Sequence, residues 1–95
     1  MKVYLLVYDE DIREERLLKF LDSRKSILNW MTALPASVLL VSRQTPRQLT
    51  NLFSKNFPAA QFLLTELEIT RTDGMLPEEC WGFIISTDER TRAQR

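Results

Sequence analysis

Histidine is absent from the 95 residues of this chain, and cysteine occurs once, at Cys80. Without an imidazole, the chain has no Ser-His or Cys-His nucleophilic pair and no histidine-containing zinc site. A single thiol forms no disulfide within the chain, which favours a reducing, cytoplasmic compartment. Any metal ion would need carboxylate and carbonyl oxygens, which are the ligands that magnesium prefers.

Glycine and long apolar runs are also scarce. Two glycines are too few for the glycine-rich loops that hold nucleotide phosphates. No apolar run approaches the eighteen or so residues of a membrane span, and the N-terminus lacks the basic-then-apolar layout of a signal peptide. We therefore expect a cytoplasmic chain that has no contact with a membrane.

Basic and acidic residues balance at thirteen each, so net charge alone predicts no attraction to nucleic acid. Their distribution is uneven. Residues 23–58 hold five basic residues and no acid, whereas residues 59–89 hold seven acids and one base. The five basic residues are Arg24, Lys25, Arg43, Arg47 and Lys55. We regard them as candidate contacts to RNA or DNA, with an ordinary solvated surface as the alternative.

The run over residues 2–8 is apolar at both alternating sets of positions, which is typical of a central strand buried on both faces. It ends in three acids at residues 9–11. The sequence predicts that Asp11 caps a helix that continues to about Ser23. Two roles are open for Asp9, which is either a turn or capping residue or a ligand of a metal ion.

Further strand patterns follow at residues 27–33, 37–42 and 61–67. Residues 45–48 read Thr-Pro-Arg-Gln, which has the form of a capping box and predicts a helix to about Asn56. The order strand, helix, strand, strand, helix, strand predicts an α+β, ferredoxin-like βαββαβ sandwich. Its four-stranded antiparallel sheet would carry both helices on one face.

The second face of that sheet also needs cover, because the strands supply apolar residues to both faces. The run at residues 81–85 predicts a short fifth strand, which would reach across to a twofold-related copy and form a homodimer. We expect one domain over residues 1–85 and a disordered polar tail over residues 86–95. An exposed sheet edge would also admit a protein partner by strand addition.

Several residues together resemble a known family. The first strand ends in Tyr8-Asp9, Ser37-Val38 opens the third strand, and a capped helix follows. These features resemble the small ferredoxin-like CRISPR-associated protein of the spacer-acquisition complex, whose wider superfamily includes VapD-type and GhoS-type toxin-antitoxin ribonucleases. The resemblance implies a homodimer in which Asp9 and its copy hold magnesium, with Ser37 in a catalytic motif.

Three features depart from the family pattern. Leu39 replaces the aromatic residue of the Ser-Val-Phe motif, and Pro35 stands where glutamine is common. The helix after the first strand begins with acids, where the family is richer in basic residues. These departures favour a relative without catalysis, outside the CRISPR machinery.

Three functions remain open. The first is a homodimeric nucleic-acid-binding module without a cofactor, and the second is a protein-interaction module; either would belong to a bacterial or phage defence or toxin-antitoxin type of system. The third is a magnesium-dependent endonuclease or endoribonuclease in which Asp9 and Asp11 hold the metal and Ser37 contacts phosphate. An RNA-recognition motif is excluded, because residues 37–42 lack the aromatic and glycine residues of its second signature.

Overall fold

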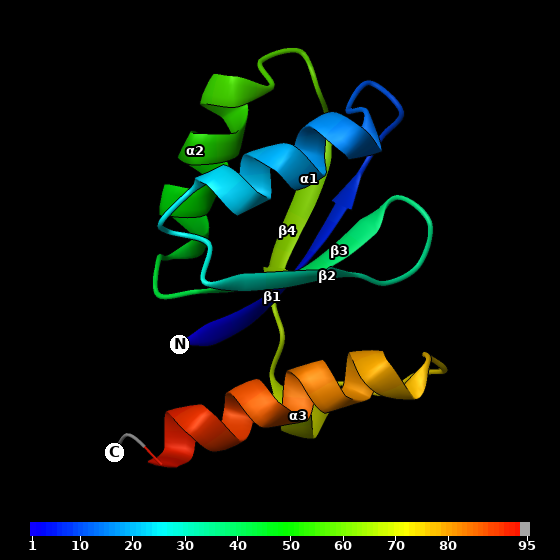
Figure 1. Cartoon of the computed structure of the whole chain (residues 1–95), viewed down its shortest axis with the longest axis vertical. Coiled ribbons are helices and arrows are strands. Elements are labelled where there is room, and N and C mark those ends of the chain that lie inside the picture. Colours follow the sequence, from blue (N-terminus) through cyan, green and yellow to red (C-terminus); the bar gives the residue numbers. More distant parts are fainter. Residues whose placement is uncertain (94–95) are drawn as a thin grey trace.

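The computed structural model describes the backbone of residues 1–93 and the side chains of residues 1–87. Figure 1 shows a layered arrangement, in which helices of the first part of the chain cover one side of the central sheet and the C-terminal helix covers the other. The elements in chain order are β1 Lys2–Tyr8, α1 Glu14–Ser23, β2 Asn29–Thr32, β3 Ser37–Ser42, α2 Pro46–Asn56, β4 Phe62–Glu66, a 3-10 turn Ile69–Arg71 and α3 Glu78–Ala93.

The sheet has the order β2-β3-β1-β4, and every neighbouring pair is antiparallel. This is the predicted ferredoxin-like arrangement, with β1 and β3 in the centre. In the register, Lys2 lies opposite Ser42 and Val7 lies opposite Ser37. The start of β1 therefore adjoins the end of β3, and the end of β1 adjoins the start of β3.

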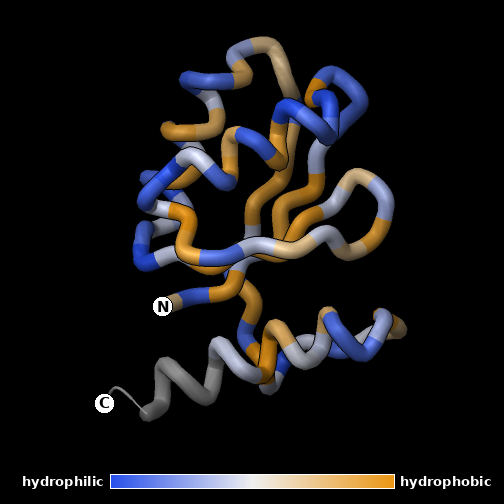
Figure 2. The backbone as a smooth tube through the Cα atoms, viewed as in Figure 1, coloured by the Kyte–Doolittle hydropathy of each residue, from blue (hydrophilic) through white to orange (hydrophobic). Residues whose placement is uncertain are grey.

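Helices α1 and α2 bury the first face of the sheet. Tyr4 and Leu40 of the central strands, Leu17 of α1, and Leu49 and Phe53 of α2 are almost inaccessible to solvent. They alternate along the strands or recur at helical spacing, as the sequence predicts. Figure 2 shows the apolar strands enclosed between helices of mixed polarity.

The predicted fifth strand is wrong. Residues 81–85 lie inside helix α3, where Cys80, Ile84 and Thr87 are buried at the helical spacing i, i+4 and i+7. A short unbroken apolar run does not distinguish a strand from a buried helix, and the uncovered sheet face decides in favour of the helix. The helix continues to Ala93, through most of the stretch expected to be a disordered tail; residues 94–95 lie outside the described part of the chain.

Helix α3 covers the second face of the sheet within the same chain. Cys80 and Ile84 pack with Val3, Leu39 and Val41 in a second core. The strand that would have joined two copies is therefore absent from the described residues, and the homodimer remains a prediction. Among these residues, none of the helices is both long and apolar enough to cross a bilayer.

Candidate functional site

The loop between α1 and β2 is tied to the junction between β3 and α2 by one buried hydroxyl. Ser42 Oγ donates to the carbonyl oxygen of Ser26 at 2.6 Å and accepts from the Gln44 N–H at 3.0 Å. The Leu28 N–H adds a backbone bond to Val41 O at 2.8 Å. These bonds place residues 24–28 beside the start of α2, although the two segments are far apart in the sequence.

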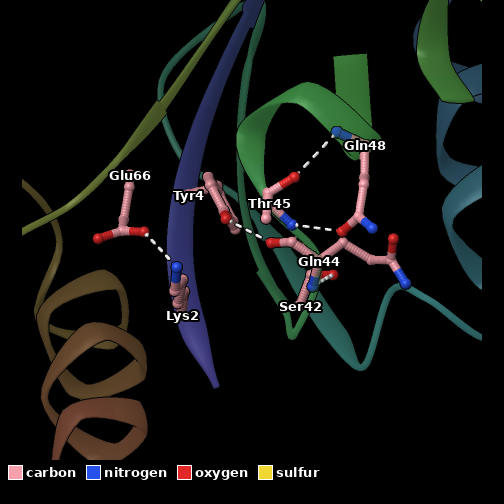
Figure 3. Close-up of polar contacts among 7 residues, drawn as sticks. All are labelled: Lys2, Tyr4, Ser42, Gln44, Thr45, Gln48 and Glu66. Carbon is pink, nitrogen blue, oxygen red and sulfur yellow. Dashed lines mark hydrogen bonds and ion pairs between the residues drawn. The ribbon is translucent and has the colours of Figure 1, made fainter. Parts of the chain in front are cut away.

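Tyr4 of β1 also bonds to the junction between β3 and α2. Its phenol donates to the carbonyl oxygen of Gln44 at 2.5 Å, so that both backbone groups of Gln44 are engaged (Figure 3). Burial, with the Glu66 carboxylate as a second cause, raises the pKa of the Tyr4 phenol above its ordinary value of 10.0. Tyr4 therefore stays protonated and continues to donate at neutral pH.

The predicted capping box at the start of α2 is confirmed. The Gln48 N–H donates to Thr45 Oγ1 at 3.2 Å, and the Thr45 N–H donates to Gln48 Oε1 at 2.9 Å (Figure 3). Pro46 occupies the first turn, where its missing N–H costs nothing. These bonds fix the residue at which α2 begins.

Between this loop and α2 lies an open groove of about 350 Å³, which we call the basic groove. Its lining combines amide, hydroxyl and ammonium groups with hydrocarbon. The lining residues are Ser26, Gln44, Gln48, Leu49, Asn51, Leu52 and Lys55. Such groups donate to and accept from a polar ligand, and the lysine favours an anionic one.

One of the five predicted basic residues lines this groove, and three more are next in sequence to a lining residue. Lys55 lines it, Lys25 precedes Ser26 in the loop, and Arg43 and Arg47 each precede a lining glutamine. All four side chains are exposed, and within the described part of the chain none of them pairs with a carboxylate. Their positive charge is therefore free to act on a ligand.

The fifth basic residue, Arg24, is partly engaged in packing. Its guanidinium donates to Asn56 Oδ1 at 3.1 Å and lies 4.7 Å from the centre of the Phe20 ring. Arg16 behaves similarly, since it donates to the Asn56 carbonyl oxygen at 3.3 Å and lies 5.0 Å from the Phe57 ring. Both arginines place positive charge at the C-terminal end of α2, where the helix dipole favours it.

The acidic residues at the end of β1 form a turn. Asp9 Oδ1 accepts the Asp11 N–H at 3.0 Å, and the Ile12 N–H donates to Asp9 O at 3.1 Å. The predicted cap at Asp11 is wrong, because this turn precedes the helix and Arg13 is the N-terminal cap. The Arg13 side chain makes no capping hydrogen bond. Among the described residues, no group of three or more acids and cysteines is arranged to hold a metal ion.

Ser37 lies at the same end of the sheet as Asp9. The Tyr8 N–H donates to Ala36 O at 3.1 Å, which joins the end of β1 to the turn before β3. Ser37 is buried, and its hydroxyl donates to Leu34 O at 2.7 Å. The observed contacts of Asp9 and Ser37 are those of turn residues, and their catalytic roles stay predictions.

Comparison of the chain with protein-family models, with curated proteins and with solved structures gave no match. The function is therefore inferred from the chemistry of the groove. Sequence reasoning identified its cations but missed Ser26, Gln44 and Asn51, because isolated polar residues in loops or on a solvated helix face carry no periodic signal. Only Gln48 had one, through the capping box.

Proposed function

We propose that this chain is a non-catalytic nucleic-acid-binding module that holds a phosphate backbone along the basic groove. The observation that carries the proposal is one groove that Lys55 lines and whose lining residues are next in sequence to Lys25, Arg43 and Arg47, with no carboxylate paired to these four cations in the described part of the chain. Lysine and arginine supply most of the affinity of proteins for nucleic acid, because they neutralise phosphates and release counterions.

The groove also offers contacts that go beyond charge. The amides of Gln44, Gln48 and Asn51 line it and can donate to and accept from sugar hydroxyls or base edges. Arg43 and Arg47 flank the N-terminal end of α2, whose dipole adds to the positive potential. An exposed single strand presents both backbone and bases to such a groove.

The distribution of charge along β1 orients the ligand. The basic groove adjoins Ser42, opposite the first residue of β1, whereas the acids at residues 9–11 follow its last residue. A seven-residue strand separates the two ends by about 20 Å, which is about twice the screening length at moderate salt. Phosphates are thus attracted at one end of the sheet and repelled at the other.

The test measures the fluorescence anisotropy of labelled single-stranded RNA and duplex DNA across a series of salt concentrations. Four neutralised phosphates predict that log K falls against log salt with a slope of about −3. Arg47→Glu and Lys55→Glu should each lower the affinity and flatten this slope. Lys19→Glu makes the same charge change on the exposed surface of α1, outside the groove, and is the matched control.

Equal losses in all three variants would mean that only total charge matters, which contradicts the groove. Unchanged binding by Arg47→Glu would count against the proposal directly. The same samples, incubated with magnesium and with a chelator, also test the nuclease alternative. Cleavage that needs magnesium and disappears in Asp9→Ala would replace the proposal with that enzyme.

A further inference from the structure

A second cavity lies on the other side of the sheet, between the strands and α3. It has a volume of about 370 Å³. Leu5, Val7 and Leu39 of the sheet form its floor, Leu34 of the β2–β3 turn forms one wall, and Trp81 of α3 forms another. We call it the apolar pocket, since hydrocarbon makes up most of its lining.

The pocket exists because α3 covers the second face incompletely. At its mouth Val7 is 41% exposed, Leu34 55% and Met75 95%. Leu63, opposite Val7 on the edge strand β4, is 64% exposed and extends the apolar surface to the edge of the sheet. Exposed apolar residues are ordinary when scattered, but a cluster at the mouth of a cavity is typical of a binding site.

The surroundings of the pocket are acidic. Asp73 lines it, and the chain between the lining residues Leu67 and Trp81 holds three more acids, Glu68, Glu78 and Glu79, against one base, Arg71. The acids at residues 9–11 begin two residues after Val7, which also lines the pocket. A polyanion would be repelled here, so this site is distinct from the basic groove.

We propose that the apolar pocket receives a bulky apolar side chain from a segment of a different protein, in which lysine or arginine flanks that side chain. The cavity is large enough to enclose such a side chain, and buried apolar anchors supply much of the affinity at protein interfaces. The flanking cations are assigned by charge complementarity with Asp73 and the acids that neighbour the lining in the sequence. Asp73 keeps a fixed orientation, because its Oδ1 accepts the Gly74 N–H at 2.8 Å.

The probe is a short synthetic peptide with a central phenylalanine between two pairs of lysines. Two matched peptides carry glutamates in place of the lysines, or serine in place of the phenylalanine. Emission of Trp81 in a Trp30→Phe background reports occupancy, because Trp81 lines the pocket whereas Trp30 bonds to Asp22 on the other face. Only the lysine peptide with phenylalanine should bind and shift this emission.

Variants locate the binding. Leu34→Glu should weaken the lysine peptide about tenfold or more, since it places a charge in the apolar wall. Ile85→Glu makes the same change at a residue of similar exposure, 44%, outside the pocket lining, and should bind normally. Asp73→Asn keeps the acceptor for Gly74 and removes the charge, so it should weaken the lysine peptide by a smaller factor.

Three results would overturn the inference. Equal binding of the lysine and glutamate peptides would remove the assigned charge preference. Unchanged binding by Leu34→Glu would place the peptide elsewhere. A dimer in sedimentation that Leu34→Glu dissociates and Ile85→Glu does not would make a second copy of this chain the occupant. RNA binding is unaffected in each case, so the inference and the proposed function fail separately.

Discussion

At the scale of single residues, buried hydroxyls hold the basic groove together. Ser42 and Tyr4 are each inaccessible to solvent, and both bond to Gln44. The sequence revealed Tyr4 as a core residue but gave no hint of these bonds. A hydrogen bond between residues forty positions apart follows from the sheet register, which no local pattern specifies.

Replacement of Ser42 should loosen the groove. Ser42→Ala leaves the buried Ser26 carbonyl and Gln44 N–H without their partner, which costs about 1–3 kcal/mol of stability. The loop that carries Lys25 is then less well placed, so the affinity for RNA should fall as well. Urea unfolding and anisotropy measure the two effects. Ser54→Ala, on the exposed side of α2, should change neither; equal effects in both variants would refute the positioning role.

Tyr4 should make the fold sensitive to alkaline pH. Burial raises the pKa of Tyr4 in the folded chain. The contribution of the protonated Tyr4 phenol to the stability of the fold is therefore fully present below the ordinary pKa of 10.0 and is lost as the pH rises above it. Burial and Glu14 raise the pKa of Tyr8 in the same direction. Thermal unfolding should show a decline above about pH 10. Tyr4→Phe should lower stability at pH 7 by about 1 kcal/mol and make that decline shallower; an unchanged decline would contradict the assignment.

Two substitutions separate the possible roles of Asp9. Asp9→Asn retains an oxygen acceptor for the Asp11 N–H, whereas Asp9→Ala does not. If Asp9 is a turn residue, Asp9→Asn should have nearly native stability and Asp9→Ala should lose about 1 kcal/mol of stability. Thermal unfolding with and without magnesium is the measurement. If magnesium raised the melting temperature of the native chain and not of Asp9→Asn, metal binding would be the better description.

At the scale of elements, local signals were reliable where one motif determines the structure. The capping box at residues 45–48 predicts the first residue of α2 correctly, because both of its hydrogen bonds join residues only three positions apart. The C-terminal segment was misread, because its β-branched and aromatic residues favour a strand and Gly82 disfavours a helix. Burial against the second sheet face outweighs these preferences, and only the complete fold reveals that face.

Substitution of Gly82 tests whether this segment is helical. A Cβ atom added at this position meets nothing within 4 Å among the described residues, so we expect the backbone preference to decide the outcome. If the segment is a helix, Gly82→Ala should stabilise the fold by about 0.5–1 kcal/mol. The alanine variant should also be more stable than Gly82→Val, because alanine has the higher helix propensity. If the segment were a strand, the valine variant would be more stable than the alanine variant. Circular dichroism during urea unfolding of the two variants therefore distinguishes the structures by the order of their stabilities.

At the scale of the whole molecule, the sheet separates two surfaces of opposite character. The basic groove is lined by α2 and the loop between α1 and β2, and the apolar pocket lies between the sheet and α3. Figure 1 shows α1 and α2 on one side of the sheet and α3 on the other. The sequence showed the uneven charge, but the pocket depends on how α3 crosses the sheet and could not be foreseen. Because no lining residue is shared, the two sites should bind their ligands independently.

Thermal shifts in two single variants measure this independence. A ligand that binds only the folded state raises its melting temperature. In Lys55→Glu the lysine peptide should still stabilise the fold while RNA no longer does, and in Leu34→Glu the reverse should hold. If either variant abolished both shifts, the two surfaces would be coupled through the sheet. The pattern expected here would instead describe a small adaptor that holds nucleic acid on one side and a basic protein segment on the other.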